Sequence, residues 1–84
     1  MTDDKEATIE RAYALVEQIK PLLAGAGPDA QGAALADLVS MWVAGHNPAI
    51  REATVQMWIE IMKALVPVSE YEMFGDAGFP EQMQ

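Results

Sequence analysis

Acid–base chemistry near neutral pH usually depends on histidine, and the sequence has one, His46. A catalytic histidine needs a nucleophile to activate and a partner that orients its ring. The two serines, Ser40 and Ser69, do not lie in a Gly-x-Ser-x-Gly turn, and there is no cysteine. A histidine between two helices more often bonds a free carbonyl at the preceding helix end or faces solvent. We therefore predict no catalytic residue, and the sequence favours a protein that is not an enzyme.

Arg51 is the second polar side chain in an unusual position. It falls in the first turn of a predicted helix, within the apolar side and between the directions of Trp58 and Val55. A cation there opposes the helix dipole, so a specific partner would have to compensate. That partner would be an ion pair between helices or chains, or an anionic ligand. The alternative is that the side chain extends past its neighbours into water.

One glycine-containing stretch has the form of a cofactor motif. Gly25–Ala30 matches the G-x-G-x-x-A variant of the dinucleotide fingerprint. That fingerprint has meaning only between a strand and a helix, whereas here a helix precedes it and Pro28 removes a backbone donor. We therefore predict no cofactor.

Two groups of carboxylates resemble a metal site in composition only. Neither has the spacing of a calcium-binding loop, and capping, solubility and a solvated tail explain them. The sequence thus predicts no metal. The groups are Asp3, Asp4 and Glu6, and Glu70, Glu72 and Asp76.

The predicted third helix has more apolar surface than one neighbour can cover. At about 100° per residue, its polar positions Glu52, Gln56, Glu60 and Lys63 occupy roughly a quarter of the circumference. A helix on the outside of a single core needs an apolar stripe of a little over about 100°. We therefore expect a homodimer or higher oligomer whose interface uses this helix. The alternative is that the helix is central in its own domain, between the first and second helices, with the tail over its remaining face. The candidate interface residues are Ile50, Arg51, Val55, Trp58, Ile59 and Met62.

Capping signals and apolar periodicity predict an all-α fold with three main helices, near residues 3–24, 28–44 and 48–66. Pro21 would normally end a helix, but Leu22 and Leu23 stay in phase with the first apolar stripe. We therefore expect the helix to bend near Pro21 and end at Gly25, with a break at Lys20 as the alternative. Asn47 and Pro48 are an N-cap followed by proline at the first helical position. Trp42 and Trp58 each lie in a bulky apolar stripe, which predicts that both are largely buried.

Pro67 is expected to stop the third helix. This divides the chain into a helical domain, residues 1–68, and residues 69–84, a short capped turn with an acidic aromatic tail. Tyr71, Phe74 and Phe79 would anchor that tail, because aromatic residues dominate interface anchors.

Composition limits the possible partners. The 84 residues carry a formal net charge of -8 and no Lys/Arg cluster, so nucleic acid is not an expected partner. The longest uncharged stretch, Leu38–Ile50, is too short to span a bilayer, and the acidic start is unlike a signal peptide. We expect a soluble, cytoplasmic protein. A single chain this short has a marginal core, and oligomerisation is one remedy.

These features favour a small acidic protein that acts through self-association and possible binding of a protein partner. Two alternatives stay open. One is a ligand-binding or enzymatic dimer with an interchain pocket that uses His46 and Arg51. The other is an acidic regulator that binds a basic protein.

Overall fold

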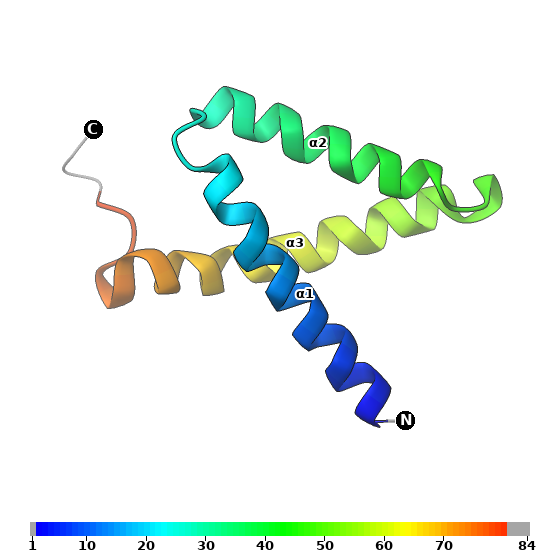
Figure 1. Cartoon of the computed structure of the whole chain (residues 1–84), viewed down its shortest axis with the longest axis horizontal. Coiled ribbons are helices and arrows are strands. Elements are labelled where there is room, and N and C mark those ends of the chain that lie inside the picture. Colours follow the sequence, from blue (N-terminus) through cyan, green and yellow to red (C-terminus); the bar gives the residue numbers. More distant parts are fainter. Residues whose placement is uncertain (1, 81–84) are drawn as a thin grey trace. The chain divides into compact units, whose positions relative to one another are not determined.

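The computed structural model of the chain describes residues 2–80, with side chains from residue 4 onward. Three α-helices make up most of it: α1 (Thr2–Leu23), α2 (Pro28–Ala44) and α3 (Arg51–Phe74). Short 3₁₀ turns, η1 (Pro48–Ile50) and η2 (Gly75–Ala77), precede and follow α3 (Figure 1). No strand occurs in the described residues, so the predicted all-α fold with three main helices is confirmed.

The chain divides into two compact units, Met1–Val39 and Ser40–Gln84, and the division falls within α2. The first unit contains α1 and most of α2. The second contains the last residues of α2, both 3₁₀ turns and α3. Each unit is described by itself.

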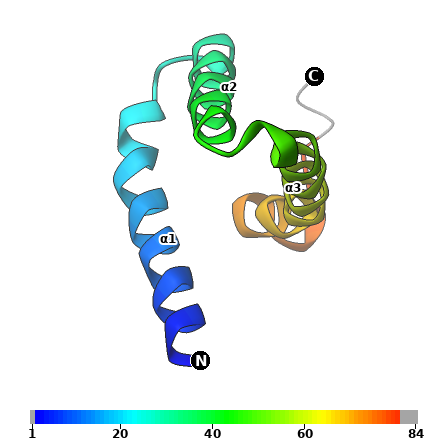
Figure 2. The same ribbon diagram turned by 90° about the vertical axis from the view of Figure 1, so that its right-hand side faces the viewer.

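In the first unit, α1 continues as one helix past Pro21, as the phase of its apolar residues predicts (Figure 2). It ends at Leu23, and Gly25 adopts a φ of 81°, which favours glycine because it has no Cβ. The Gln31 amide donates a 2.9 Å hydrogen bond to the Leu23 carbonyl, which satisfies one of the free acceptors at the helix end. Pro28 opens α2 as expected. α1 begins at Thr2, one residue before its expected start at Asp3.

In the second unit, the prediction that Pro67 ends the third helix is wrong. α3 extends to Phe74 with Pro67 inside it. Proline removes one N–H donor, the partner that the Lys63 carbonyl would otherwise have four residues later. The helix nevertheless continues, because the apolar residues after Pro67 keep the phase of those before it. Gly75 ends it with a φ of 72°, and its N–H donates to the Tyr71 carbonyl.

The described side chains show almost no core. Thr54, at 8% exposure, is the one buried residue from 4 to 80, and no hydrophobic side chain in that range is buried. The prediction of a largely buried Trp42 is therefore wrong, because it is 45% exposed. Trp58 is half-buried. The apolar stripes exist as the sequence predicts, but little within either unit covers them.

Candidate interaction surface

The turn between α2 and α3 holds both residues that were candidates for polar chemistry. We call residues Trp42–Arg51 the corner. The Arg51 guanidinium donates from Nη2 to the Ala44 carbonyl at 2.8 Å and from Nε to the His46 carbonyl at 3.0 Å. These acceptors lie at and just beyond the C-terminal end of α2, where carbonyls lack helical partners and the dipole favours a cation. The partner that compensates for the position of Arg51 is thus the end of the preceding helix.

His46 also bonds the end of α2. Its Nδ1 lies 2.8 Å from the Trp42 carbonyl, and because a carbonyl only accepts, this nitrogen is the donor. The imidazole meets the Trp42 ring edge to face, with centroids 4.9 Å apart. This hydrogen bond is the structural role expected for His46, a bond to a free carbonyl at the end of the preceding helix.

Asn47 completes the corner as predicted. Its side chain accepts a 2.9 Å hydrogen bond from the Ala49 N–H, and Pro48 follows as the first residue of η1. The capped segment is a 3₁₀ turn that leads into α3, so the helix proper begins three residues later than expected. The corner therefore satisfies its polar groups through contacts within a few residues.

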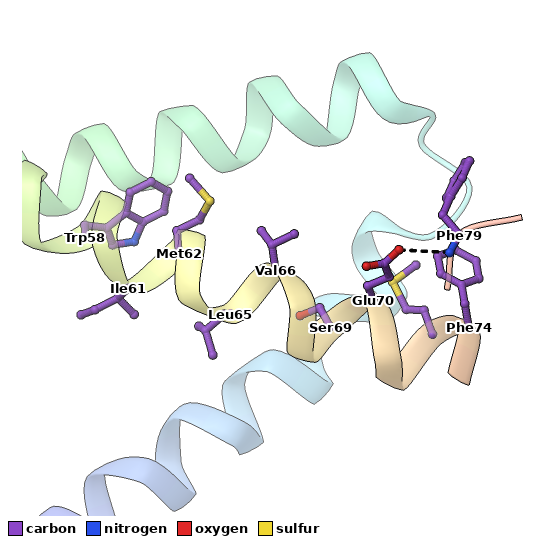
Figure 3. Close-up of a pocket in the computed structure, with 10 residues that line it drawn as sticks. Trp58, Ile61, Met62, Leu65, Val66, Ser69, Glu70, Phe74 and Phe79 are labelled. Atoms are coloured by element: carbon purple, nitrogen blue, oxygen red, sulfur yellow. Dashed lines mark hydrogen bonds between the residues drawn. The ribbon is translucent and has the colours of Figure 1, made fainter. Parts of the chain in front are cut away.

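A long apolar groove runs along α3 from Trp58 to its C-terminal end (Figure 3). It has a volume of about 580 Å³. Isoleucine, leucine, valine, methionine and aromatic side chains line it, together with two polar side chains, Ser69 and Glu70. The lining residues, which we call the α3 groove, are Trp58, Ile61, Met62, Leu65, Val66, Ser69, Glu70, Met73, Phe74 and Phe79.

The end of the groove is closed by the segment Gly75–Pro80, which we call the C-terminal hook. The Phe79 N–H donates a 3.0 Å hydrogen bond to Glu70 Oε2, and the Phe79 ring packs edge to face on Phe74 at 5.5 Å (Figure 3). Gly78 has a φ of 72°, and a Cβ there would lie 3.2 Å from the same Glu70 oxygen. Glycine at this position therefore allows the chain to turn back over the helix.

The α3 groove is lined by residues that remain open to solvent. Leu65 is 53% exposed and Ile61 is 51% exposed, while Met73 reaches 71%. Contiguous exposed apolar surface of this kind marks an interaction site on soluble proteins more often than it occurs without function. Helix-in-groove recognition uses surfaces of this shape.

The predicted interface residues fall in different places. Trp58 and Met62 line the α3 groove, whereas Ile50, Val55 and Ile59 do not, and Arg51 belongs to the corner. Among the predicted tail anchors, Phe74 and Phe79 line the groove and Tyr71 does not. Sequence reasoning missed six lining residues because it ended the helix at Pro67 or left them unassigned. These are Ile61, Leu65, Val66, Ser69, Glu70 and Met73.

The C-terminal end of the groove is acidic, whereas Lys63, nearer its middle, falls on the groove side of α3 at about 100° per residue. Residues 64–80 carry three carboxylates, Glu70, Glu72 and Asp76, and no lysine, arginine or histidine. An occupant with an apolar face and basic edges would complement this end of the groove.

Among the described residues, none of the helices is both long and apolar enough to cross a membrane. No three histidine, cysteine or carboxylate side chains among the described residues could hold a metal ion together. No protein-family model, curated protein or solved structure matches this chain.

Proposed function

We propose that this protein acts by self-association, with the α3 groove as the contact surface. The single observation that carries the proposal is that the groove is long, continuous and uncovered, on a helix whose neighbours in its own unit bury no hydrophobic side chain among residues 40–80. A second copy supplies the missing cover.

The energetics support an association of useful strength. Complete burial of a leucine, isoleucine or methionine side chain contributes about 1.5–3 kcal/mol. Covering the exposed half of each groove residue therefore contributes roughly 1 kcal/mol per residue. The eight apolar lining residues thus offer a total comparable to the roughly 8 kcal/mol of a micromolar complex, before the costs of association.

Light scattering on three full-length proteins tests the proposal. The wild type is expected at twice the 9.1 kDa chain mass, or a higher multiple, at tens of micromolar. Leu65→Glu is expected at the chain mass, because it places a carboxylate in the groove. Ala64→Glu is the matched control, since it adds the same charge one residue away at an exposed position that does not line the groove.

Two results would overturn the proposal. One is a wild type that has the chain mass at these concentrations. The other is a Leu65→Glu protein that keeps both its helical circular dichroism and the wild-type mass, because the contact would then lie elsewhere.

A further inference from the structure

The α3 groove has an occupant of defined chemistry within this sequence. We propose that, in the self-associated protein, α1 of one copy lies in the α3 groove of the other. The inference rests on the proposed self-association and adds the segment that makes the contact.

The length of the apolar stripe on α1 matches the groove. The stripe runs from Ile9 to Leu22, which spans about 20 Å at 1.5 Å per residue. The groove floor from Trp58 to Phe74 spans about 24 Å on the same basis. The stripe is uncovered in its own unit, with Leu15 at 50% and Leu22 at 80% exposure.

The charges on α1 are arranged to suit an acidic groove. Three of the five basic residues of the chain lie on this helix. At about 100° per residue, Lys5 falls within the apolar stripe and Arg11 and Lys20 fall at its two edges. The helix also carries five carboxylates. Glu10 and Glu17 fall on its opposite side, whereas Asp4 falls at the edge of the stripe, in the direction of Leu22. Lys20 forms a 2.7 Å ion pair with Glu17.

The other apolar helix fits less well. The bulky face of α2 runs from Leu35 to Val43, about 12 Å, which is half the length of the groove. Its only charged residues are Asp29 and Asp37, and at about 100° per residue Asp37 falls opposite the bulky face. That face therefore offers no basic residue to an acidic surface. The length of the stripe and the basic residues along it both favour α1.

A second copy is the source of α1 because a single chain of 84 residues has little area with which to bury stripes on three helices. Two copies that exchange α1 reciprocally bury both grooves in one symmetric contact. The competing arrangement, in which α1 covers the groove of its own chain, gives a different result in each experiment below.

Cysteine cross-linking tests the assignment, because the native chain has no cysteine. Leu15→Cys chains that carry a mass tag are mixed with untagged chains that carry one cysteine in the groove. The untagged variants are Met62→Cys, Leu65→Cys and Met73→Cys, each used in a separate mixture. Together they scan the position of α1 along the groove. Oxidation is expected to give a disulfide-linked mixed dimer for at least one combination. Tyr13→Cys, two residues away and outside the stripe, is the control and is expected to give no such band.

A charge exchange provides a second readout. Glu10→Arg combined with Arg11→Glu keeps the net charge at -8 and moves the positive charge away from the stripe edge. The dissociation constant of the self-associated protein is expected to rise about tenfold, which corresponds to about 1.4 kcal/mol, with unchanged helicity.

The outcomes separate the two proposals. If the wild type associates but no Leu15 combination cross-links and the charge exchange has no effect, the inference is wrong and self-association stands. If Leu15→Cys and Met62→Cys in one chain close within that chain and no mixed dimer forms, α1 covers its own groove and the inference is again wrong. If the wild type is monomeric, both proposals fail.

Discussion

The corner and the α3 groove lie in the same unit but differ in whether their side chains find partners within it. In the corner, Arg51, His46 and Asn47 each bond a backbone group no more than seven residues away. In the groove, apolar side chains along more than four turns have no cover from residues 40–80, the described part of their own unit. Polar groups can be satisfied by neighbours in the chain, because a hydrogen bond needs one partner. Apolar surface needs an area as large as itself, which a lone helix cannot provide.

The two tryptophans test this contrast with the largest expected effect. Trp58 lines the groove, while Trp42 lies in the corner against His46. Trp58→Ala is expected to lower the free energy of unfolding by about 3 kcal/mol, because it removes a large side chain from the surface that we propose a second copy covers. Trp42→Ala is expected to cost about 1 kcal/mol, since much of that ring stays in water. Urea unfolding at one fixed protein concentration measures both, and equal losses would remove the distinction.

Replacing Pro67 tests the backbone beneath the groove. Pro67→Ala restores a donor for the Lys63 carbonyl and is expected to raise the free energy of unfolding by about 2 kcal/mol. Pro21→Ala makes the same change in the last turns of α1, where a smaller gain is expected. Thermal unfolding of both variants measures this, and a loss of stability for Pro67→Ala would mean that the groove requires the shape that proline imposes.

Removing the guanidinium tests the corner. Arg51→Ala breaks two hydrogen bonds to carbonyls at the end of α2 and is expected to lower the free energy of unfolding by about 1–2 kcal/mol. Arg51→Lys keeps the charge without the fork geometry and is expected to lose about half as much. Neither variant is expected to change the mass measured by light scattering. A monomeric Arg51→Ala protein would show that the corner belongs to the interface.

The smallest expected effect is at the cap of η1. Asn47→Ala removes the acceptor for the Ala49 N–H and is expected to cost about 1 kcal/mol. Asn47→Asp keeps an acceptor oxygen and is expected to remain close to the wild type in chemical unfolding. If both variants lose the same stability, the side-chain bond is not what stabilises the turn.

The sequence predicted those parts of the fold that depend on local signals. The start of α2 at Pro28, the cap at Asn47 and the continuation of α1 past Pro21 all follow from residue type and phase. The same reasoning failed at Pro67, where the loss of one hydrogen bond was expected to end the helix. In α1 the phase of the following leucines was weighed against proline, and in α3 the phase of Val68–Phe74 was not.

The candidate site was predicted only in part for a related reason. Trp58 and Met62 lie before Pro67 and were identified, whereas Val66 was seen as apolar but not as part of a continuous surface. Glu70 and Met73 belong to the groove because the helix continues and the hook folds back over it. The hydrogen-bond partner of Arg51 could not be predicted from the sequence, because it is a backbone carbonyl and every residue has one.

Nuclear Overhauser spectroscopy on a mixed sample tests most directly whether a second copy covers the α3 groove. Equal amounts of ¹³C-labelled and unlabelled chains are combined, and only contacts between the two kinds of chain are detected. If a second copy covers the groove, cross-peaks are expected from the methyl groups of Met62, Leu65 and Val66 to protons of the unlabelled chain. Methyl groups at these positions that show contacts only within their own chain would contradict it.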